Sequence, residues 1–243
     1  MNPAPRPSSS VDRLVGSSIG KYRVLAFAGR GGMGMVWKAE DSTLGRAVAL
    51  KFLPEHQTSS PTLRRRFVRE ARTAGQLQHP GIATVYEAGE SEGEPYIAFQ
   101  WVDGETIADL ISRGPLPSAD ALRIARDAAE ALAYAHGHGV LHRDISARNI
   151  MVCRDGRTMI LDFGLALAAG SSRITSSSTT MGTTPYLAPE VILGGASTER
   201  SDLYALGVVL YEMLTGTTPF AGERPEAILY AAVNEPLDTS RLR

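Results

Sequence analysis

The strongest constraint on the fold of this chain is a predicted β-hairpin whose open end carries oxygen-bearing side chains. Residues 150–153 and 159–161 are short apolar runs separated by an Asp-Gly turn sequence, a pattern typical of two paired strands. Asn149 comes just before the first strand and Asp162 just after the second, so the hairpin brings them side by side. An amide oxygen beside a carboxylate suits a hard divalent cation such as Mg²⁺. Asp144, a few residues earlier, is placed to orient a nucleophile, and the arrangement predicts phosphoryl transfer.

The motifs around this hairpin resemble those of the protein kinase family. His-Arg-Asp at 142–144, with Asn149 five positions after the aspartate, is similar to the catalytic loop, and Asp-Phe-Gly at 162–164 is similar to the metal loop. The resemblance implies that Asp144 accepts the proton of the acceptor hydroxyl, and that Asn149 and Asp162 bind Mg²⁺ or Mn²⁺. Either triplet alone would fit an ordinary hairpin with polar ends, but both in this order favour the kinase site.

A glycine-rich sequence near the N-terminus predicts a phosphate-binding loop. Gly29, Gly31 and Gly34 form a G-x-G-x-x-G pattern. A dinucleotide-binding fold competes for this pattern, but it requires a helix after the glycines, whereas residues 35–39 are typical of a strand. By resemblance, the hairpin holds its backbone close over the phosphates of ATP, so these glycines and Val36 are expected to bind the nucleotide.

A lysine and a glutamate are the next expected partners. Lys51 lies on a predicted strand at 46–53. Glu70 lies on the apolar stripe of a helix predicted to begin after Ser60, three residues after Phe67. Burying a carboxylate without a partner is unfavourable, so we expect Glu70 to pair with Lys51. In the family this pair binds the α- and β-phosphates of ATP.

The resemblance implies an α+β fold with two lobes. A small, mainly β lobe with one helix is expected at 19–101. A larger, mainly helical lobe is expected at 102–243, lacking the last helices of the family. Residues 1–18, rich in proline and serine, are predicted to be a disordered leader. The adenine pocket is assigned by resemblance to four residues: Ala49, Phe99, Val102 and Met151.

The larger lobe is expected to contain helices at 105–112, 118–136, 202–214 and 224–233. The second has a periodic apolar stripe predicted to face inward, formed by Leu122, Ala125, Ala129 and Leu132. The third is apolar on almost all sides, which predicts full burial. By resemblance, Asp202 anchors the catalytic loop, and Glu190 pairs with an arginine of the late helices that this sequence does not supply.

The serine- and threonine-rich segment at 171–180 lies where the family has its activation loop. Thr175, Ser177 and Thr179 are therefore the expected phosphorylation sites. Arg143 is expected to bind the resulting phosphate through charge-assisted hydrogen bonds. Thr183 belongs to a sequence that resembles the substrate platform of serine/threonine kinases rather than that of tyrosine kinases.

Bulk properties exclude several other classes of function. The net charge of −1 predicts neither a nucleic-acid surface nor an anionic-membrane surface. The single cysteine, Cys153, excludes an internal disulfide and fits a reducing compartment. No apolar run has the length of a membrane span, and the N-terminal residues lack the apolar core typical of a signal peptide. We therefore expect a cytoplasmic location, while an anchor beyond Arg243 in a longer protein stays open.

The predicted function is transfer of the ATP γ-phosphoryl group to Ser or Thr hydroxyls of protein substrates, together with autophosphorylation of the activation loop. The lysine that the family usually has two residues after the catalytic aspartate is Ser146 here. We expect Arg148 to replace that lysine near the γ-phosphate, because a guanidinium can bind the same oxygens. The alternative is a pseudokinase, a module that binds nucleotide or a partner protein without turnover.

Overall fold

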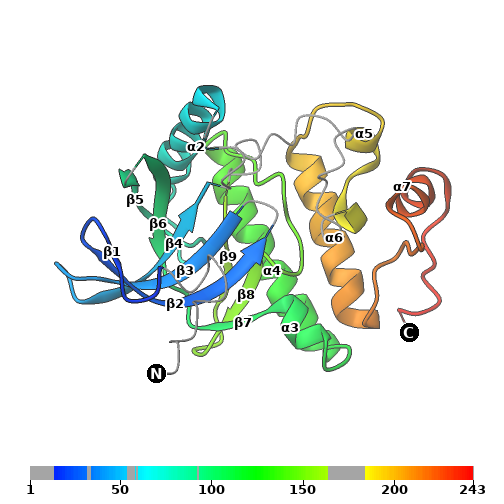
Figure 1. Ribbon diagram of the computed structural model, residues 1–243. Helices are drawn as coiled ribbons and strands as arrows, with labels where there is room; N and C mark the ends of the chain where they lie inside the picture. Colours follow the sequence, from blue (N-terminus) through cyan, green and yellow to red (C-terminus); the bar gives the residue numbers. More distant parts are fainter. Residues whose placement is uncertain are drawn as a thin grey trace, which may run out of the picture.

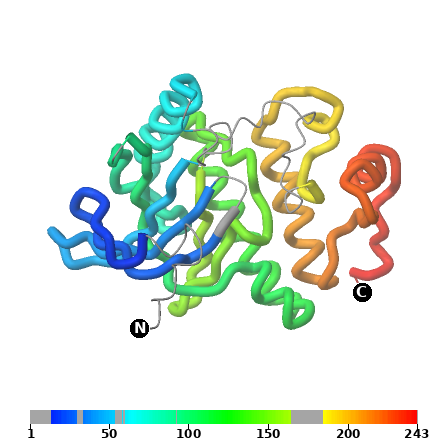
Figure 2. The backbone as a smooth tube through the Cα atoms, in the orientation of Figure 1, coloured from blue at the N-terminus to red at the C-terminus, as the bar shows by residue number. Residues whose placement is uncertain are grey.

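The chain forms two lobes, which agrees with the fold class expected from its sequence (Figure 1). This computed structural model describes residues 14–31, 34–53, 58, 60–91, 93–163 and 184–242. The chain passes from the smaller, mainly β lobe into the larger, mainly helical lobe (Figure 2).

The smaller lobe is built on a six-stranded antiparallel sheet with the order β1-β2-β3-β4-β6-β5. Side chains alternate between its two faces. One face forms an aromatic-rich core that includes Trp37 and Phe52, whose rings meet edge to face at 5.2 Å. The strands are β1 (Ser18–Ile19), β2 (Tyr22–Gly31), β3 (Gly34–Asp41), β4 (Arg46–Phe52), β5 (Val85–Ser91) and β6 (Glu94–Gln100).

The other face of this sheet is covered by helix α2 (Pro61–Ala74). Ser60 begins the helix as expected, since its side chain accepts a hydrogen bond from the Leu63 backbone N–H at 3.4 Å. The buried face of α2 carries Phe67 and Glu70, so the predicted inward stripe is confirmed at these positions.

The larger lobe is organised around the packing of α4 against α6. Ile124 and Leu132 of α4 share one core with Val209 and Met213 of α6. A three-stranded sheet, β7-β8-β9, lies at the edge of this lobe that meets the smaller one. Its elements are β7 (Gly104–Thr106), α3 (Ile107–Ile111), α4 (Ser118–Gly137), β8 (Ile150–Cys153), β9 (Thr158–Ile160), η2 (Thr184–Tyr186), α5 (Pro189–Ile192), α6 (Glu199–Thr215) and α7 (Pro225–Asn234).

The predicted leader is too long at its C-terminal end. Leu14 packs against the core of the smaller lobe, and the Ser17 carbonyl accepts a hydrogen bond from the Val24 N–H at 2.9 Å. Ser18 pairs with Arg23 between β1 and β2. The remainder of the predicted leader, residues 1–13, lies outside the described residues.

The helix predicted at 105–112 begins later than expected. Glu105 pairs with Val152 between β7 and β8, and the helix starts only after Thr106. Thr106 and Asp109 cap each other's backbone N–H groups, which fixes the start of α3. The first part of the predicted helix is therefore a strand.

The inward faces of two helices also differ from the predictions. Leu122 in α4 is 57% exposed, whereas Leu132 is buried as expected. The buried stripe lies one position earlier, with Ala121 and Ile124, because both stripes fit helical spacing and the small alanine allows closer packing. In α6, Leu203 is 49% exposed, so the prediction of a fully buried helix is wrong on that side.

Candidate active site

The β8–β9 hairpin brings its two ends together as predicted. Ile150 pairs with Ile160, and the Leu161 N–H donates a hydrogen bond to the Asn149 carbonyl at 2.8 Å. Asn149 and Asp162 therefore lie at one end of the hairpin, immediately outside its last paired residues. Their oxygen atoms are the kind of ligand that Mg²⁺ or Mn²⁺ requires.

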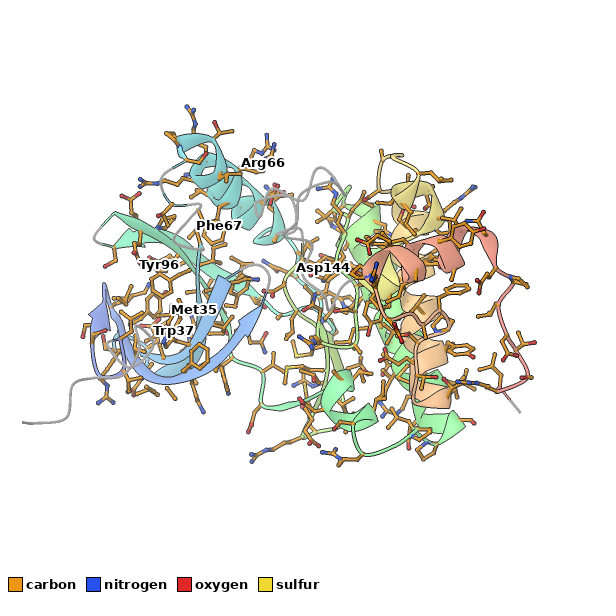
Figure 3. The ribbon with its side chains drawn as sticks, turned by 45° about the vertical axis from the view of Figure 1, so that its right-hand side comes forward. Met35, Trp37, Arg66, Phe67, Tyr96 and Asp144 are labelled. Atoms are coloured by element: carbon orange, nitrogen blue, oxygen red, sulfur yellow. The ribbon has the colours of Figure 1, made fainter. Side chains whose placement is uncertain are left out.

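Asn149 also contacts the predicted catalytic base. Its side-chain nitrogen donates to the Asp144 carbonyl at 2.7 Å and to the Asp144 carboxylate at 2.9 Å. Because the nitrogen of the amide makes both bonds, the amide oxygen stays available for a cation. Burial raises the pKa of Asp144, although the hydrogen bond from Asn149 acts in the opposite direction. Asp144 lies on the side of the larger lobe that faces the smaller one (Figure 3).

His142 is the buried centre of this loop, a role that our sequence reasoning missed. Its ring nitrogen Nε2 lies 2.7 Å from the Leu161 carbonyl, and Nδ1 lies 3.2 Å from the Asp144 N–H. A carbonyl only accepts and an N–H only donates, so His142 is neutral with its proton on Nε2. Phe163 packs edge to face on the ring at 4.8 Å. The one histidine thus ties the catalytic loop to the metal loop.

Asp202 anchors the backbone of the catalytic loop, as expected from the resemblance. Its carboxylate accepts hydrogen bonds from the backbone N–H groups of His142 and Arg143, both at 2.8 Å. His136, at the end of α4, contributes Nε2 at 2.9 Å from the same carboxylate. His136 was not singled out from the sequence, although its place in the last turn of the long helix is a usable signal.

Two residues of the site have a left-handed backbone conformation that non-glycine residues rarely adopt. The φ angles are +67° at Arg143 and +61° at Asp162. Such conformations cost of order 1–3 kcal/mol each and persist where surrounding contacts enforce them. Here the hydrogen bond to Asp202 enforces the first and the ion pair with Lys51 supports the second.

Lys51 joins the two lobes. It is 3% exposed on β4, and its Nζ lies 2.7 Å from the Asp162 carboxylate. The expected contact between Lys51 and Glu70 stays a prediction. The contact with Asp162 joins residues 111 positions apart in the sequence, and only the closure of the lobes brings them within reach.

The predicted nucleotide-binding residues come from both lobes. In the smaller lobe Val36 lies opposite Lys51, and Ala49 lies opposite Phe99. Gly31 pairs with Gly34 where β2 turns into β3, and Gly29 lies opposite Val36. Val102 is buried in a cluster against which Met151 packs. Their contact with a nucleotide stays a prediction.

The remaining predicted positions divide into two groups. The side chains of Arg143 and Arg148 are exposed beside the catalytic loop, where they are accessible to phosphate groups. The expected acceptor and platform residues lie outside the described residues: Thr175, Ser177, Thr179 and Thr183.

Glu190 was expected to lack the arginine partner that the family resemblance implies, and the structure shows a hydroxyl partner for it instead. The Ser201 hydroxyl donates a hydrogen bond to the Glu190 carboxylate at 2.7 Å. Ser201 occupies the first turn of α6, where it also closes the cap with Thr198. The Ser201 hydroxyl in the first turn of α6 therefore links this helix to Glu190 of α5.

Comparison with known proteins agrees with this geometry. A family model described as protein kinase domain matches residues 22–241. The chain is 42% identical over 217 residues to the serine/threonine-protein kinase PrkC of Bacillus subtilis, and 40% identical over 223 residues to PknE of Mycobacterium tuberculosis. These matches cover 88% and 91% of the chain. The resemblance inferred from the sequence is thereby confirmed.

Solved structures give the same result for the fold. A kinase domain of Mycobacterium tuberculosis PknI aligns with a TM-score of 0.71 at 29% identity, covering 91% of each chain. The chain spans about a third of the length of its curated relatives, 34% for PrkC and 39% for PknE. No helix among the described residues combines the length and apolarity that crossing a membrane requires.

Proposed function

Since the chain belongs to the protein kinase family, we propose that it transfers the γ-phosphoryl group of ATP to serine and threonine hydroxyls of proteins. The main observation behind this proposal is the hydrogen bond from the Asn149 side-chain nitrogen to the Asp144 carboxylate at 2.9 Å. Both residues lie on a loop whose backbone is hydrogen-bonded to Asp202. The proposed base, Asp144, and the proposed oxygen ligand, Asn149, would thus be held in place before any substrate binds. Such preorganisation is the main contribution that a kinase makes to catalysis.

The donor set fits the divalent ion that the family uses. Asn149 and Asp162 would hold Mg²⁺ or Mn²⁺ through an amide oxygen and a carboxylate, and the bound ion would neutralise phosphate charge. Lys51 already faces Asp162, so its ammonium is placed to bind a phosphate oxygen in the same space. Val36, Ala49, Val102 and Met151 would pack against the adenine ring of ATP.

Asp144 is the proposed base. It would orient the acceptor hydroxyl and accept its proton as the hydroxyl oxygen bonds to phosphorus and the bond to the leaving ADP oxygen breaks. Partial burial raises its pKa and therefore its basicity. The hydrogen bond from Asn149 fixes the direction of the carboxylate.

Arg148 is proposed to supply the positive charge that the absent lysine would give. Ser146 is buried, at 4% exposed, and cannot itself reach a phosphate. The exposed Arg148 lies two residues further on the same loop, and its guanidinium can bind two phosphate oxygens at once. We also propose that the enzyme phosphorylates its own activation loop at Thr175, Ser177 or Thr179, and that Arg143 binds the phosphate formed.

The test is phosphate transfer from labelled ATP with Mg²⁺, compared between the wild-type chain and Asp144→Asn. Asp144→Asn should transfer at least about a hundredfold less, because a general base contributes at least this much. Binding of a fluorescent ATP analogue should stay unchanged. Asp155→Asn, on the exposed turn of the hairpin, is the matched control and should transfer normally.

The outcomes separate the two candidate functions. If Asp144→Asn transfers phosphate as fast as wild type, Asp144 is not the base. If wild type binds the analogue but transfers nothing to itself or to generic protein substrates, the chain is the pseudokinase that the Ser146 replacement leaves open.

A further inference from the structure

The outer face of α2 carries an unusual concentration of positive charge. The helix contains five arginines and a single acidic residue, the buried Glu70. The chain as a whole has a net charge of −1, so this charge is local to the helix. The arginines are Arg64, Arg65, Arg66, Arg69 and Arg72.

Three of these arginines form one exposed row. Arg65, Arg69 and Arg72 are spaced by four and three residues, which places them on the same side of the helix. That side lies away from Phe67, which faces the strands (Figure 3). Arg64 forms an ion pair with Glu90 at 2.6 Å, but none of the described residues forms an ion pair with the three arginines of the row.

This arrangement opposes the stability of the helix. Like charges three or four residues apart repel each other on a helix surface. The first turn of α2 contains no acidic residue, and cations near a helix N-terminus interact unfavourably with its macrodipole. An anion bound across the row would remove both effects.

The row borders a groove between α2 and the β5–β6 hairpin. Its volume is about 520 Å³. Its charged lining has four arginines and, among the described residues, one carboxylate, that of Glu90: Arg64, Arg65, Arg69 and Arg72 are the arginines. Pro61, Val68 and Pro95 provide apolar contacts. We call this the α2 groove.

We propose that the α2 groove is a docking surface for an acidic segment of a partner protein. Carboxylates of the segment would pair with Arg65, Arg69 and Arg72, and an aliphatic side chain would pack on Val68. Nucleic acid fits less well, because none of the described residues that line the groove has an aromatic side chain to stack on a base. A membrane surface also fits less well, since the large exposed apolar residues of the described chain lie outside α2.

The test measures binding without ATP, so its result is independent of the proposed catalytic function. A fluorescein-labelled glutamate-rich peptide that contains leucine is titrated with the full chain, and anisotropy is followed. A lysine-rich peptide of the same length should not bind. Combined Arg65→Glu, Arg69→Glu and Arg72→Glu should weaken glutamate-peptide binding by about tenfold or more, since three attractive pairs become repulsive.

A matched control makes the same change in net charge elsewhere. Arg126→Glu, Arg154→Glu and Arg157→Glu reverse three exposed arginines of the larger lobe, and this variant should bind the glutamate peptide like wild type. If it weakens binding as much as the α2 variant does, the attraction is unspecific and the proposal fails. The proposal also fails if the α2 variant, shown to be folded by its thermal melt, binds like wild type.

Two further measurements test whether the partner is an acidic protein segment. Arg65→Gln, Arg69→Gln and Arg72→Gln should also weaken binding, and these changes remove repulsion within the helix, so this variant should fold even if the glutamate variant does not. A labelled single-stranded DNA and phosphatidylserine vesicles are tested in parallel. Tighter binding of either one than of the peptide, lost in the α2 variants, would overturn the choice of an acidic protein segment.

Discussion

At the scale of single residues, the catalytic loop is held by two buried polar side chains, His142 and Asp202. The neutral His142 links the catalytic and metal loops, and Asp202 accepts two backbone N–H groups of the first loop. Among the proposed catalytic residues, Arg148 alone is assigned its role because another residue departs from the family pattern: Ser146 stands where the family has a lysine. It therefore gives a sharp test.

Arg148→Ala should lower kcat by about tenfold or more, because a cation near the transferred phosphoryl group stabilises its charge. Nucleotide binding should change less than kcat. Adding Ser146→Lys should restore part of the activity, provided that the buried site accommodates the longer side chain. Arg154→Ala, which removes an exposed arginine at the hairpin turn, is the control for steady-state kinetics. A silent Arg148→Ala would show that the cation comes from elsewhere.

Glu212 provides a pH-dependent prediction. Burial raises its pKa above the ordinary value of 4.5, while the Tyr186 hydroxyl, which donates to the carboxylate at 2.7 Å, acts in the opposite direction. Because its pKa is higher in the folded state, the contribution of Glu212 to the free energy of unfolding is largest below about pH 4.5. This contribution is lost as the pH rises through the folded-state pKa. Glu212→Gln keeps an acceptor for Tyr186 without the charge. It should therefore raise the melting temperature at neutral pH and change it little near pH 4. Equal effects at both pH values would contradict this account.

At the scale of elements, the position of the catalytic loop depends on the small sheet beneath it. β7 pairs with β8, which leads directly from Asn149. Gly104 lies in β7 against the backbone of β8, where a Cβ atom would collide with the Val152 carbonyl. The pairing of these strands therefore requires glycine at this position.

Gly104→Ala should destabilise the fold by about 1–3 kcal/mol, because overpacking forces the backbone to move. Denaturant unfolding would measure the loss. Gly137→Ala is the matched control: nothing lies within 4 Å of the added Cβ at the end of α4. It should be neutral or slightly stabilising, since alanine favours a helix. If both variants unfold alike, the β7–β8 contact is looser than the structure shows.

At the scale of the whole molecule, Lys51 and Asp162 form an ion pair between the lobes at 2.7 Å. Breaking a buried pair is unfavourable because it leaves one charge without its partner. The bridge also places the ammonium of one lobe beside the proposed metal ligand of the other. Relative placement of the lobes and assembly of the site are therefore coupled.

A double-mutant cycle with Lys51→Met and Asp162→Asn tests this coupling. Each single change should destabilise the protein, and the double variant should lose less than the sum, with a coupling energy of about 0.5–3 kcal/mol. Denaturant unfolding supplies the four free energies. Lys38→Met with Asp162→Asn is the control cycle, since Lys38 contacts the ring of Trp101 instead. Additive losses in the first cycle would show that the bridge does not join the lobes in solution.

The sequence by itself determined the local elements and the chemistry at the hairpin. The β8–β9 pairing, the start of α2 after Ser60 and the inward position of Glu70 all follow from short-range patterns, because turns, caps and periodic burial act within a few residues. The meeting of Asn149 and Asp162 follows from the same hairpin. The family resemblance added Asp202, whose contacts with the catalytic loop the structure confirms.

Only the tertiary structure decided which partners meet across the chain. Lys51 forms an ion pair with Asp162, and the Ser201 hydroxyl donates a hydrogen bond to Glu190. The packing of the lobes and of the helices sets both distances. The buried face of α4 was also undecided, since stripes one residue apart fit the same helical period and only contact with α6 selects one. Local sequence fixes the direction of a side chain relative to its own element. What that side chain meets depends on how distant elements pack.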